Sequence, residues 1–509
     1  MRLELDLDFT EAFAPDNFFF GVAYAPYCEG GLNHADGLKN TDWARLHEQG
    51  KEAGEGIRFW TDYADHIELA ASLGLNAFRM GIEWARCQPS ASIEPTEPPP
   101  WDEAALDHYA DMVELVIDRG MQPIVTLHHF THPLWLGLDI WLEDRGPDLL
   151  VDAQVRIVDE INARLMARGG KKMAHFLVYN EPNLIPLFYH SMGWYPVERS
   201  GPDYLLPAFD TMLSHYIKAY DGIHDLFEER GWDTPHVGYT IASLCPYEYD
   251  KQLDDLVRLR SWGVAREDVA AKIADCRNAW RARIDALARS QLTDEQHARY
   301  VETITMTADT LRPERFTKTL DALYASPRVK KLDYLSLNVY EPFGGQRRDP
   351  RDTDRGIPWD TYMMDGEVYR SFIQAKNDFN DNLPVYMGEN SCANFQPIGE
   401  AAIPRPDGWT RERYLKTYIM EMIRCMKEGV PIRGYLYWTL VDDVQPPRLG
   451  LYSYDFVNHR ILDTDGFGQP SGEIYAHLVE ALRSADKATI SEAFVKVHEP
   501  SRHDDDPAH

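Results

Sequence analysis

The sequence predicts an α/β chain folded as a (β/α)8 TIM barrel, a single domain with long loops after its strands. Eight short runs rich in β-branched and aromatic residues recur along the chain, and longer segments with helical periodicity separate them. The runs are almost continuously apolar, as expected for parallel strands buried on both faces. A doubly wound open sheet is the main alternative, but no GxGxxG motif follows the first run.

The eight predicted strands are spaced widely enough for a helix between each pair. They cover residues 18–24, 76–86, 121–130, 174–182, 236–246, 332–340, 383–390 and 432–442. Helical periodicity is clear at 104–120, where five apolar residues share one face and Gly120 ends the helix before the next strand. These five residues are Leu106, Tyr109, Met112, Val113 and Val116.

One segment interrupts this pattern. Residues 249–316 form a long, charged, helical insertion between strands five and six, which is either an external decoration or a lid over the barrel mouth. We expect residues 1–498 to form the barrel and residues 499–509 to form a flexible acidic tail. The aspartates at 504–506 are a solvated charge run rather than a metal site.

Bulk composition excludes several classes of partner. The chain has 509 residues, 44% of them hydrophobic, and a formal net charge of −30, which disfavours nucleic acid and anionic membranes. Neither a secretory signal nor a membrane-spanning run is expected. Without CxxC or zinc-like spacing, the cysteines are expected to be free thiols in the cytoplasm. They are Cys28, Cys87, Cys245, Cys276, Cys392 and Cys425.

Polar residues occur where the predicted strands end, which is where a barrel of this type carries its active site. Buried polar groups cost several kcal/mol unless they are satisfied, so a group of them at one rim predicts a shared pocket. The residues are Arg79, Trp84, His128, His129, Asn180, Glu181, Asn338, Tyr340, Glu389, Asn390, Trp438, Asp442 and Asp443.

Two glutamates in this set suit glycoside hydrolysis. The reaction needs one carboxyl that is protonated at neutral pH and one that stays ionised. If Glu181 and Glu389 lie about 5–5.5 Å apart, the ionised one attacks the anomeric carbon and configuration is retained. Sequence spacing does not supply that distance, and either glutamate alone is equally well explained as a buried ion-pair partner.

The residues around these glutamates resemble glycoside hydrolase family 1, the retaining β-glucosidases and their relatives, from about Phe18 to Phe456. FFFGVAYAPY is similar to the family's first strand, FRMGIEWAR to FRxSIxWSR, and TLHHFTHPLWL to TLxHxxxPxWL. VYNEPN is similar to TxNEP, LSLNVY to GLNYY, and PVYMGEN to PIYITENG. YWTLVDD and RLGLYSYDF are similar to WSLLDN and RFGLxxVDY.

The resemblance implies a role for each matching residue. Glu181 would be the general acid and base, and Glu389 the nucleophile. Arg79, Tyr340 and Asn338 would support the nucleophile, with Arg79 and Tyr340 holding it ionised. The sugar-binding residues would be His129, Asn180 at the 2-hydroxyl, and Trp438 as the stacking platform. The implied mechanism needs neither a metal nor another cofactor.

Two sugar-reading positions depart from the family pattern. Cys28 stands where the family's first strand has a glutamine for the 3- and 4-hydroxyls, unless a one-residue shift brings Glu29 there. After strand eight, Gln445 and Pro446 replace the pattern that supplies a glutamate for the 4- and 6-hydroxyls. Because a thiol is a weak hydrogen-bond partner, we expect an atypical glycone, and the loop also lacks the Lys-Tyr pair of 6-phospho-glycosidases.

Three functions are compatible with these motifs. The first is a retaining β-glycosidase acting on a small-molecule glycoside or oligosaccharide. The second is a transglycosylase that passes the same covalent intermediate to an acceptor other than water. The third is a non-catalytic sugar-binding barrel, against which the paired glutamates argue, because a binding module needs no acid and nucleophile.

Overall fold

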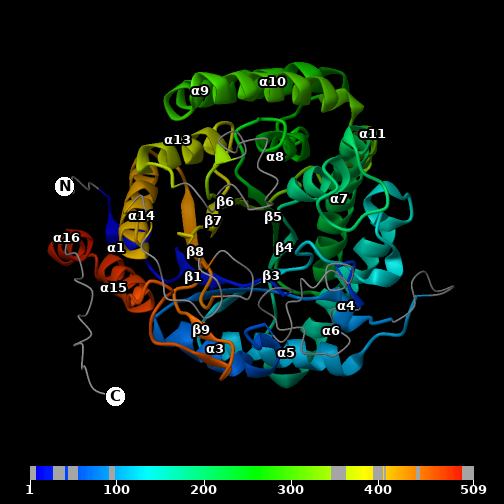
Figure 1. Cartoon of the computed structure of the whole chain (residues 1–509). Helices are drawn as coiled ribbons and strands as arrows, with labels where there is room; N and C mark the ends of the chain where they lie inside the picture. Colours follow the sequence, from blue (N-terminus) through cyan, green and yellow to red (C-terminus); the bar gives the residue numbers. More distant parts are fainter. Residues whose placement is uncertain are drawn as a thin grey trace.

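The computed structural model describes residues 7–26, 40–43, 56–90, 98–344, 363–393, 405, 408–442 and 448–495. Its centre is a closed barrel in which eight parallel strands pair in chain order and β1 pairs with β8 (Figure 1). The predicted (β/α)8 barrel is therefore confirmed. The strands are β1 Phe19–Ala23, β2 Ala77–Gly81, β3 Gln122–Thr126, β4 His175–Asn180, β5 His236–Ala242, β6 Leu335–Asn338, β7 Val385–Glu389 and β8 Ile432–Trp438.

Helices surround the barrel, and a short antiparallel pair, β9 Tyr454–Asp455 and β10 Arg460–Ile461, follows β8. In the described part of the chain the helices are α1 Phe9–Ala12, α3 Phe59–Ser72, α4 Trp84–Cys87, α5 Glu103–Asp118, α6 Gly146–Gly169, α7 Leu205–Arg230, α8 Lys251–Arg258, α9 Val269–Gln291, α10 Asp294–Thr310, α11 Thr317–Ala325, α13 Gly366–Asn377, α14 Arg411–Lys427, α15 Ser471–Ser484 and α16 Lys487–Val495.

Each predicted strand contains an observed strand, and every observed strand is shorter than its predicted range. The apolar runs continue into the loops that carry functional residues, so composition alone does not mark where pairing stops. Trp84 shows the consequence: we expected it on the second strand, but β2 ends at Gly81 and Trp84 begins α4. Its indole donates at 2.9 Å to Oε1 of Gln88, the residue that follows α4.

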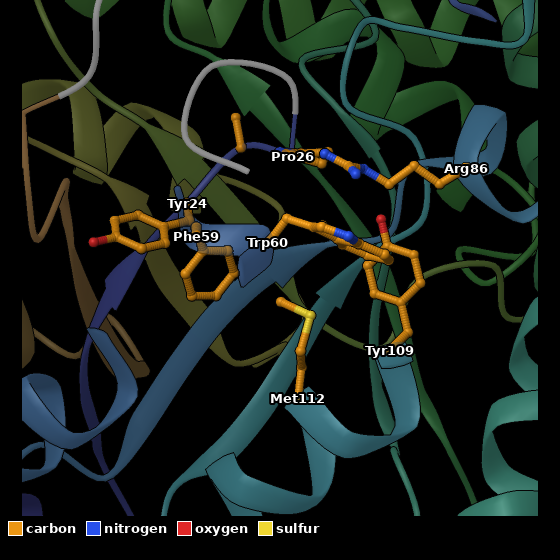
Figure 2. Close-up of a pocket in the computed structure, with 9 residues that line it drawn as sticks. Tyr24, Pro26, Phe59, Trp60, Arg86, Tyr109 and Met112 are labelled. Atoms are coloured by element: carbon orange, nitrogen blue, oxygen red, sulfur yellow. The ribbon is translucent and has the colours of Figure 1, made fainter. Parts of the chain in front are cut away.

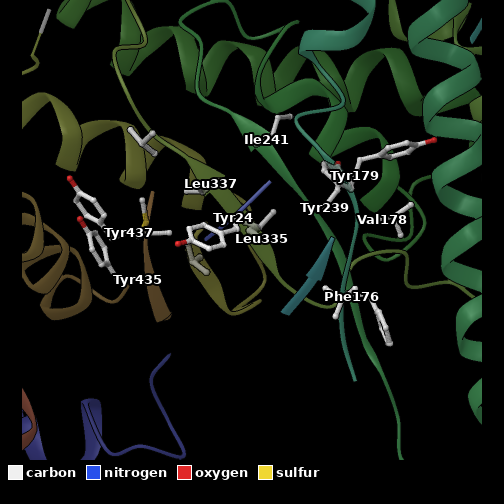
Figure 3. Packing of buried hydrophobic residues seen from close by; sticks show 14 of the residues in the cluster. Tyr24, Phe176, Val178, Tyr179, Tyr239, Ile241, Leu335, Leu337, Tyr435 and Tyr437 are labelled. Carbon is white, nitrogen blue, oxygen red and sulfur yellow. The ribbon is translucent and has the colours of Figure 1, made fainter. Parts of the chain in front are cut away.

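Two apolar layers hold the barrel together. The outer layer lies between the strands and the helices, and Figure 3 shows part of it. It includes Phe176, Val178, Tyr239, Ile241, Leu335, Leu337, Tyr435 and Tyr437. A smaller cluster fills the barrel interior and includes Ala77, Ile124, Leu177, Tyr334 and Leu436. Because side chains alternate along a strand, the two clusters draw on neighbouring positions of the same strands.

Above the interior apolar cluster, polar side chains fill the barrel toward its carboxyl end. Arg79, Thr240 and Asn338 are fully buried there. Strand register changes at this level, between Leu177 and Asn180 in β4 and at Asn338 beside Glu389. Such irregularities re-aim side chains near active sites.

The 249–316 insertion contains α8, α9 and α10. Figure 1 shows α9 and α10 at the outer edge of the ring of helices, and α9 contacts α8 and α13. Ion pairs bind the segment to its neighbours: Arg277 Nε lies 2.7 Å from Glu248, and Lys376 of α13 pairs with Asp250 and Asp254. These contacts hold the segment against the outer helix α13.

No helix of the described residues is both long enough and apolar enough to span a bilayer. The predicted tail at 499–509 lies outside the described residues.

Candidate active site

The two predicted glutamates occupy the carboxyl ends of β4 and β7. Glu181 directly follows Asn180, the last residue of β4, and Glu389 is the last residue of β7. Both are buried, with 6% and 4% of their surface exposed. Glu389 lies opposite Asn338 in the β6–β7 pairing, and the amide of Asn338 reaches Glu181. Asn338 of β6 therefore lies between the strand that ends in Glu389 and the carboxyl of Glu181.

Glu389 is held by two strong donors. Arg79 Nη1 donates to its Oε1 at 2.8 Å, and the Tyr340 hydroxyl donates to its Oε2 at 2.9 Å. Arg79 is fully buried, so the ion pair is shielded from solvent. Arg79 also donates to Thr126 Oγ1 at 3.1 Å and to the Gly388 carbonyl at 3.1 Å, which fixes the guanidinium plane. Both oxygens of the Glu389 carboxylate thus have directed partners.

The surroundings of Glu181 stabilise a negative charge less than those of Glu389 do. Asn338 Nδ2 donates to Glu181 Oε1 at 2.8 Å. The main chain of Glu181 has a φ of 47°, which is uncommon for a residue with a side chain. Its N–H donates to the Thr240 carbonyl at 2.7 Å, and its carbonyl accepts from Leu184 at 2.9 Å. These bonds hold the backbone in a conformation that turns the acid toward the barrel axis.

The pair is electrostatically unequal. Burial and the charge of Glu389 raise the pKa of Glu181 to about 8, against smaller opposing effects from Asn338 and Arg79. Burial also raises the pKa of Glu389, but the charge of Arg79 and the hydrogen bonds from Tyr340 and Arg79 lower it. Because Arg79 pairs directly with Glu389, the proton that the two carboxyls share belongs on Glu181. This is the division of protonation that an acid and a nucleophile require.

Three further predicted residues line the same end of the barrel. Asn180 accepts from Arg79 Nη2 at 2.6 Å through its Oδ1, while its buried Nδ2 has no partner among the described residues. His129 stacks against Trp438, with ring centroids 5.7 Å apart, and burial lowers the pKa of His129 well below its usual value. The Nδ1 of His129 is also buried and unpartnered within the described chain. Unsatisfied buried polar atoms beside a pair of acids are suited to binding a polar ligand.

Other residues from the sequence analysis do not join this group. His128 turns into the core, where its ring lies 5.3 Å from Trp141 and 5.4 Å from Tyr179. Asp442 accepts from Gly450 N–H at 2.7 Å and from the Ser453 hydroxyl at 3.0 Å, so it holds a loop. The predicted sugar readers Cys28, Glu29 and Gln445, together with Asp443, lie outside the described residues.

Two hydroxyl residues of the site were missed by sequence reasoning. Thr126 accepts from Arg79 Nε, and Thr240 donates to Asn338 Oδ1 at 2.7 Å. Each sits on an apolar strand at a position that faces the barrel interior. Threonine is common in β-strands, so its presence there does not indicate a functional residue. The sequence pointed to these two residues only by placing a hydroxyl within an otherwise apolar run.

A separate small pocket lies outside the barrel, between β2, α3 and α5 (Figure 2). The Arg86 guanidinium lies over the Trp60 ring, 4.2 Å from its centroid, and Tyr109 and Met112 close the side formed by α5. The pocket contains none of the residues that contact Glu181 or Glu389. It is therefore distinct from the site described above.

No group of three or more His, Cys, Asp or Glu side chains in the described part of the chain could hold a metal ion. A protonated and an ionised carboxyl at the mouth of a (β/α)8 barrel are the pair that glycoside hydrolysis requires, so the site is that of a glycosidase.

Comparison with known proteins agrees with this class. The chain belongs to glycosyl hydrolase family 1, whose family model matches residues 10–460. It is a retaining β-glycosidase, an O-glycosyl hydrolase, as its sequence motifs predict. One relative is a chloroplastic β-D-glucosidase of Zea mays, 4-hydroxy-7-methoxy-3-oxo-3,4-dihydro-2H-1,4-benzoxazin-2-yl glucoside β-D-glucosidase 2, which is 24% identical over 85% of this chain and 78% of its own length.

Solved structures share the fold. The β-glycosidase from Pyrococcus horikoshii superposes with a TM-score of 0.62 at 19% identity, covering 96% of this chain and 99% of its own. The β-glucosidase from Thermotoga maritima in complex with azafagomine gives a TM-score of 0.65 at 18% identity, covering 92% and 98%.

Proposed function

We propose that the chain hydrolyses a β-linked glycoside by double displacement, with Glu389 as nucleophile and Glu181 as general acid and base. The observation that carries this assignment is the unequal support of the two carboxyls. Glu389 accepts hydrogen bonds from a buried arginine and a phenol, whereas the described partner of the Glu181 carboxyl is a neutral amide. A charged carboxylate is favoured where cationic donors meet it, and a proton is favoured where they do not.

In the first step, an oxygen of Glu389 attacks the anomeric carbon and the bond to the aglycone oxygen breaks. Glu181 gives its proton to that oxygen, so the aglycone leaves as an alcohol. The glycosyl ester has neutralised Glu389, which lowers the affinity of Glu181 for a proton. In the second step Glu181 takes a proton from water, water attacks the anomeric carbon, and Glu389 is released as a carboxylate.

We further propose that Asn180, His129 and Trp438 bind the sugar in the reacting subsite. The buried Nδ2 of Asn180 has no acceptor in the part of the chain that the structure describes, and Arg79 holds the opposite end of that amide. Trp438 retains 9% exposure and is stacked with His129, so one indole face can support a sugar ring. Aromatic faces bind the apolar C–H surface of a ring while nearby polar groups read its hydroxyls.

The glycone is proposed to be atypical: deoxygenated, modified, or part of a larger conjugate. The reason is the replacement of two hydroxyl-reading positions by Cys28 and Gln445. A site built to pair with sugar hydroxyls loses much of its selectivity when those partners are missing.

Initial rates on a panel of aryl β-glycosides, with equal leaving groups, test the glycone proposal. The panel should include glucoside, galactoside, mannoside, fucoside and 2-deoxyglucoside. We expect the glucoside not to be the best substrate. A glucoside that leads the panel by tenfold or more would contradict the proposal. Addition of an alcohol acceptor in the same assay separates hydrolysis from transglycosylation by its products.

Replacement of the nucleophile tests the mechanism itself. Glu389→Ala is expected to reduce kcat on the order of 10⁴-fold or more, because the covalent route is lost. Azide should restore part of the activity with an α-glycosyl azide as product, since the small anion attacks from the vacated face. Activity close to that of the unmodified enzyme would reject Glu389 as nucleophile.

A cytoplasmic location is also proposed. The five cysteines in the described part of the chain are free and buried, which agrees with a reducing compartment.

A further inference from the structure

We propose that Thr240 is a positioning residue that fixes which end of the Asn338 amide faces Glu181 and Glu389. This inference rests on the proposed roles of the two glutamates and adds a residue that touches neither carboxylate. Thr240 lies on β5, between the strand that leads to Glu181 and the strand that ends in Asn338.

The contacts of the amide are directional. The Thr240 hydroxyl donates to Asn338 Oδ1 at 2.7 Å, so the oxygen end of the amide faces β5. The nitrogen end then donates to Glu181 Oε1 at 2.8 Å and approaches Asn180 Oδ1 at 3.3 Å. If the amide turned over, its oxygen would face Asn180 Oδ1 and the ionised form of Glu181 without a hydrogen between them, so the charged state of Glu181 would lose its donor. A hydroxyl can donate one hydrogen bond and can also accept, and Thr240 donates to the oxygen end of the amide. In a turned amide the hydroxyl would accept from Nδ2 and its own proton would lose Asn338 Oδ1 as acceptor.

The bond between Thr240 and Asn338 is closely surrounded by protein. Thr240 and Asn338 are both fully buried. A Cβ on Gly388 would lie 2.8 Å from Thr240 Oγ1 and 3.0 Å from Asn338 Oδ1, so only glycine fits beside the pair. The Thr240 carbonyl also accepts the N–H of Glu181 at 2.7 Å. Its side chain and main chain therefore align two parts of the same acid site.

Fixing the Asn338 amide should affect the pKa of both carboxyls. The Asn338 amide lowers the pKa of Glu181 and also that of Glu389 by hydrogen bonding to their charged forms. An amide that is no longer fixed donates less consistently to either one. Both pKa values should then rise, since each ionised form loses a donor.

The test is the pH dependence of kcat/KM for Thr240→Val, Thr240→Ala and Thr240→Ser, on whichever aryl glycoside leads the panel. Valine keeps the shape of threonine but has no hydroxyl, and serine keeps the hydroxyl. We expect both limbs of the profile to move to higher pH by about half to one unit in the valine and alanine variants. Serine should restore the position of both limbs. Alanine serves as the second hydroxyl-free variant if the valine protein does not fold.

Ser336→Ala is the matched control, because Ser336 is the partner of Thr240 in the β5–β6 pairing. Its profile should keep the limbs of the unmodified enzyme. A lower rate with unmoved limbs in the valine or alanine variant would reduce Thr240 to a packing role and overturn the inference. A serine variant shifted as far as alanine would also overturn it.

Failure of the proposed function gives a different result. If Glu389→Ala keeps activity, the assignment of the nucleophile is wrong whatever the Thr240 variants do. If Glu389→Ala is inactive and is rescued by azide while the Thr240 profiles coincide with that of the unmodified enzyme, only the positioning role fails.

Discussion

Arg79 and Glu389 form a buried ion pair that joins the second strand to the seventh, with Nη1 and Oε1 2.8 Å apart. The two side chains are 0% and 5% exposed, so solvent screens the pair little. Arg79 also donates to Asn180 at 2.6 Å, and this bond directs the Asn180 Nδ2 away from the arginine. One guanidinium thus keeps a carboxylate charged and orients a neighbouring amide donor.

Loss of this guanidinium should shift the activity profile. In Arg79→Met, burial of Glu389 is no longer opposed by a cation, so its pKa should rise and the acidic limb of kcat/KM should move up by one unit or more. Removing one partner of a buried pair also destabilises a fold by about 3–5 kcal/mol. Urea unfolding and the pH profile measure the two effects. An acidic limb that does not move would mean that Arg79 does not control the ionisation of Glu389.

The control for Arg79→Met is an exposed ion pair, that of Arg119 and Glu68. Its side chains are 40% and 47% exposed. Arg119→Met should leave both limbs and the unfolding curve close to those of the unmodified enzyme, because exposed pairs contribute little.

The basic limb of kcat/KM should fall near pH 8. The reaction needs Glu181 protonated, and burial together with the charge of Glu389 raises its pKa to about 8. Glu181→Gln removes the titrating group, so its residual activity on a dinitrophenyl glycoside, which needs no proton at the leaving oxygen, should lose that limb. A basic limb that survives in Glu181→Gln would assign it to another group.

The raised pKa of Glu181 should also make the stability of the fold depend on pH. The pKa of Glu181 is higher in the folded chain than in the unfolded one, so the folded form binds the extra proton between about pH 4.5 and pH 8. Its contribution to stability is present at low pH and is lost as pH rises through the folded value. Glu181→Gln should therefore melt higher than the unmodified enzyme at pH 9, and the difference should shrink toward pH 5.

Scanning calorimetry at both pH values measures this difference. Glu295→Gln is a suitable control because that side chain is 86% exposed and lies on α10. A melting difference for Glu181→Gln that is equal at pH 5 and pH 9 would contradict the raised pKa.

The buried Nδ2 of Asn180, which has no acceptor among the described residues, predicts a loss of activity that depends on the substrate. Asn180→Ala should lower kcat/KM of the parent glycoside by about 100-fold, since hydrogen bonds at the 2-position strengthen in the transition state. On the matching 2-deoxy glycoside the same variant should lose tenfold or less beyond the cost of the missing hydroxyl. Kinetics on the two substrates form a double-difference measurement. Equal losses on both would place Asn180 elsewhere than the 2-hydroxyl.

The sequence by itself determined the barrel, because eight apolar runs separated by amphipathic helices bury their surface in few other ways. It also singled out the two glutamates, because each stands in a motif, VYNEPN or PVYMGEN, that is similar to a motif of the family. It did not mark the ends of the strands. Trp84 was expected on β2 but begins α4, because apolar composition continues past the last paired residue.

Only the tertiary structure decided which polar residues share a site. His128 and His129 are adjacent in sequence, yet one packs on Trp141 in the core and the other stacks on Trp438. Register changes near Asn180 and Asn338 turn side chains toward the barrel axis, and no local pattern encodes them. The hydroxyl of Thr240 matters because β5 brings it to Asn338, 98 residues further along the chain. This contact arises because β5 pairs with β6 across the long segment between them, so the proton balance between the glutamates is a property of the fold rather than of either motif.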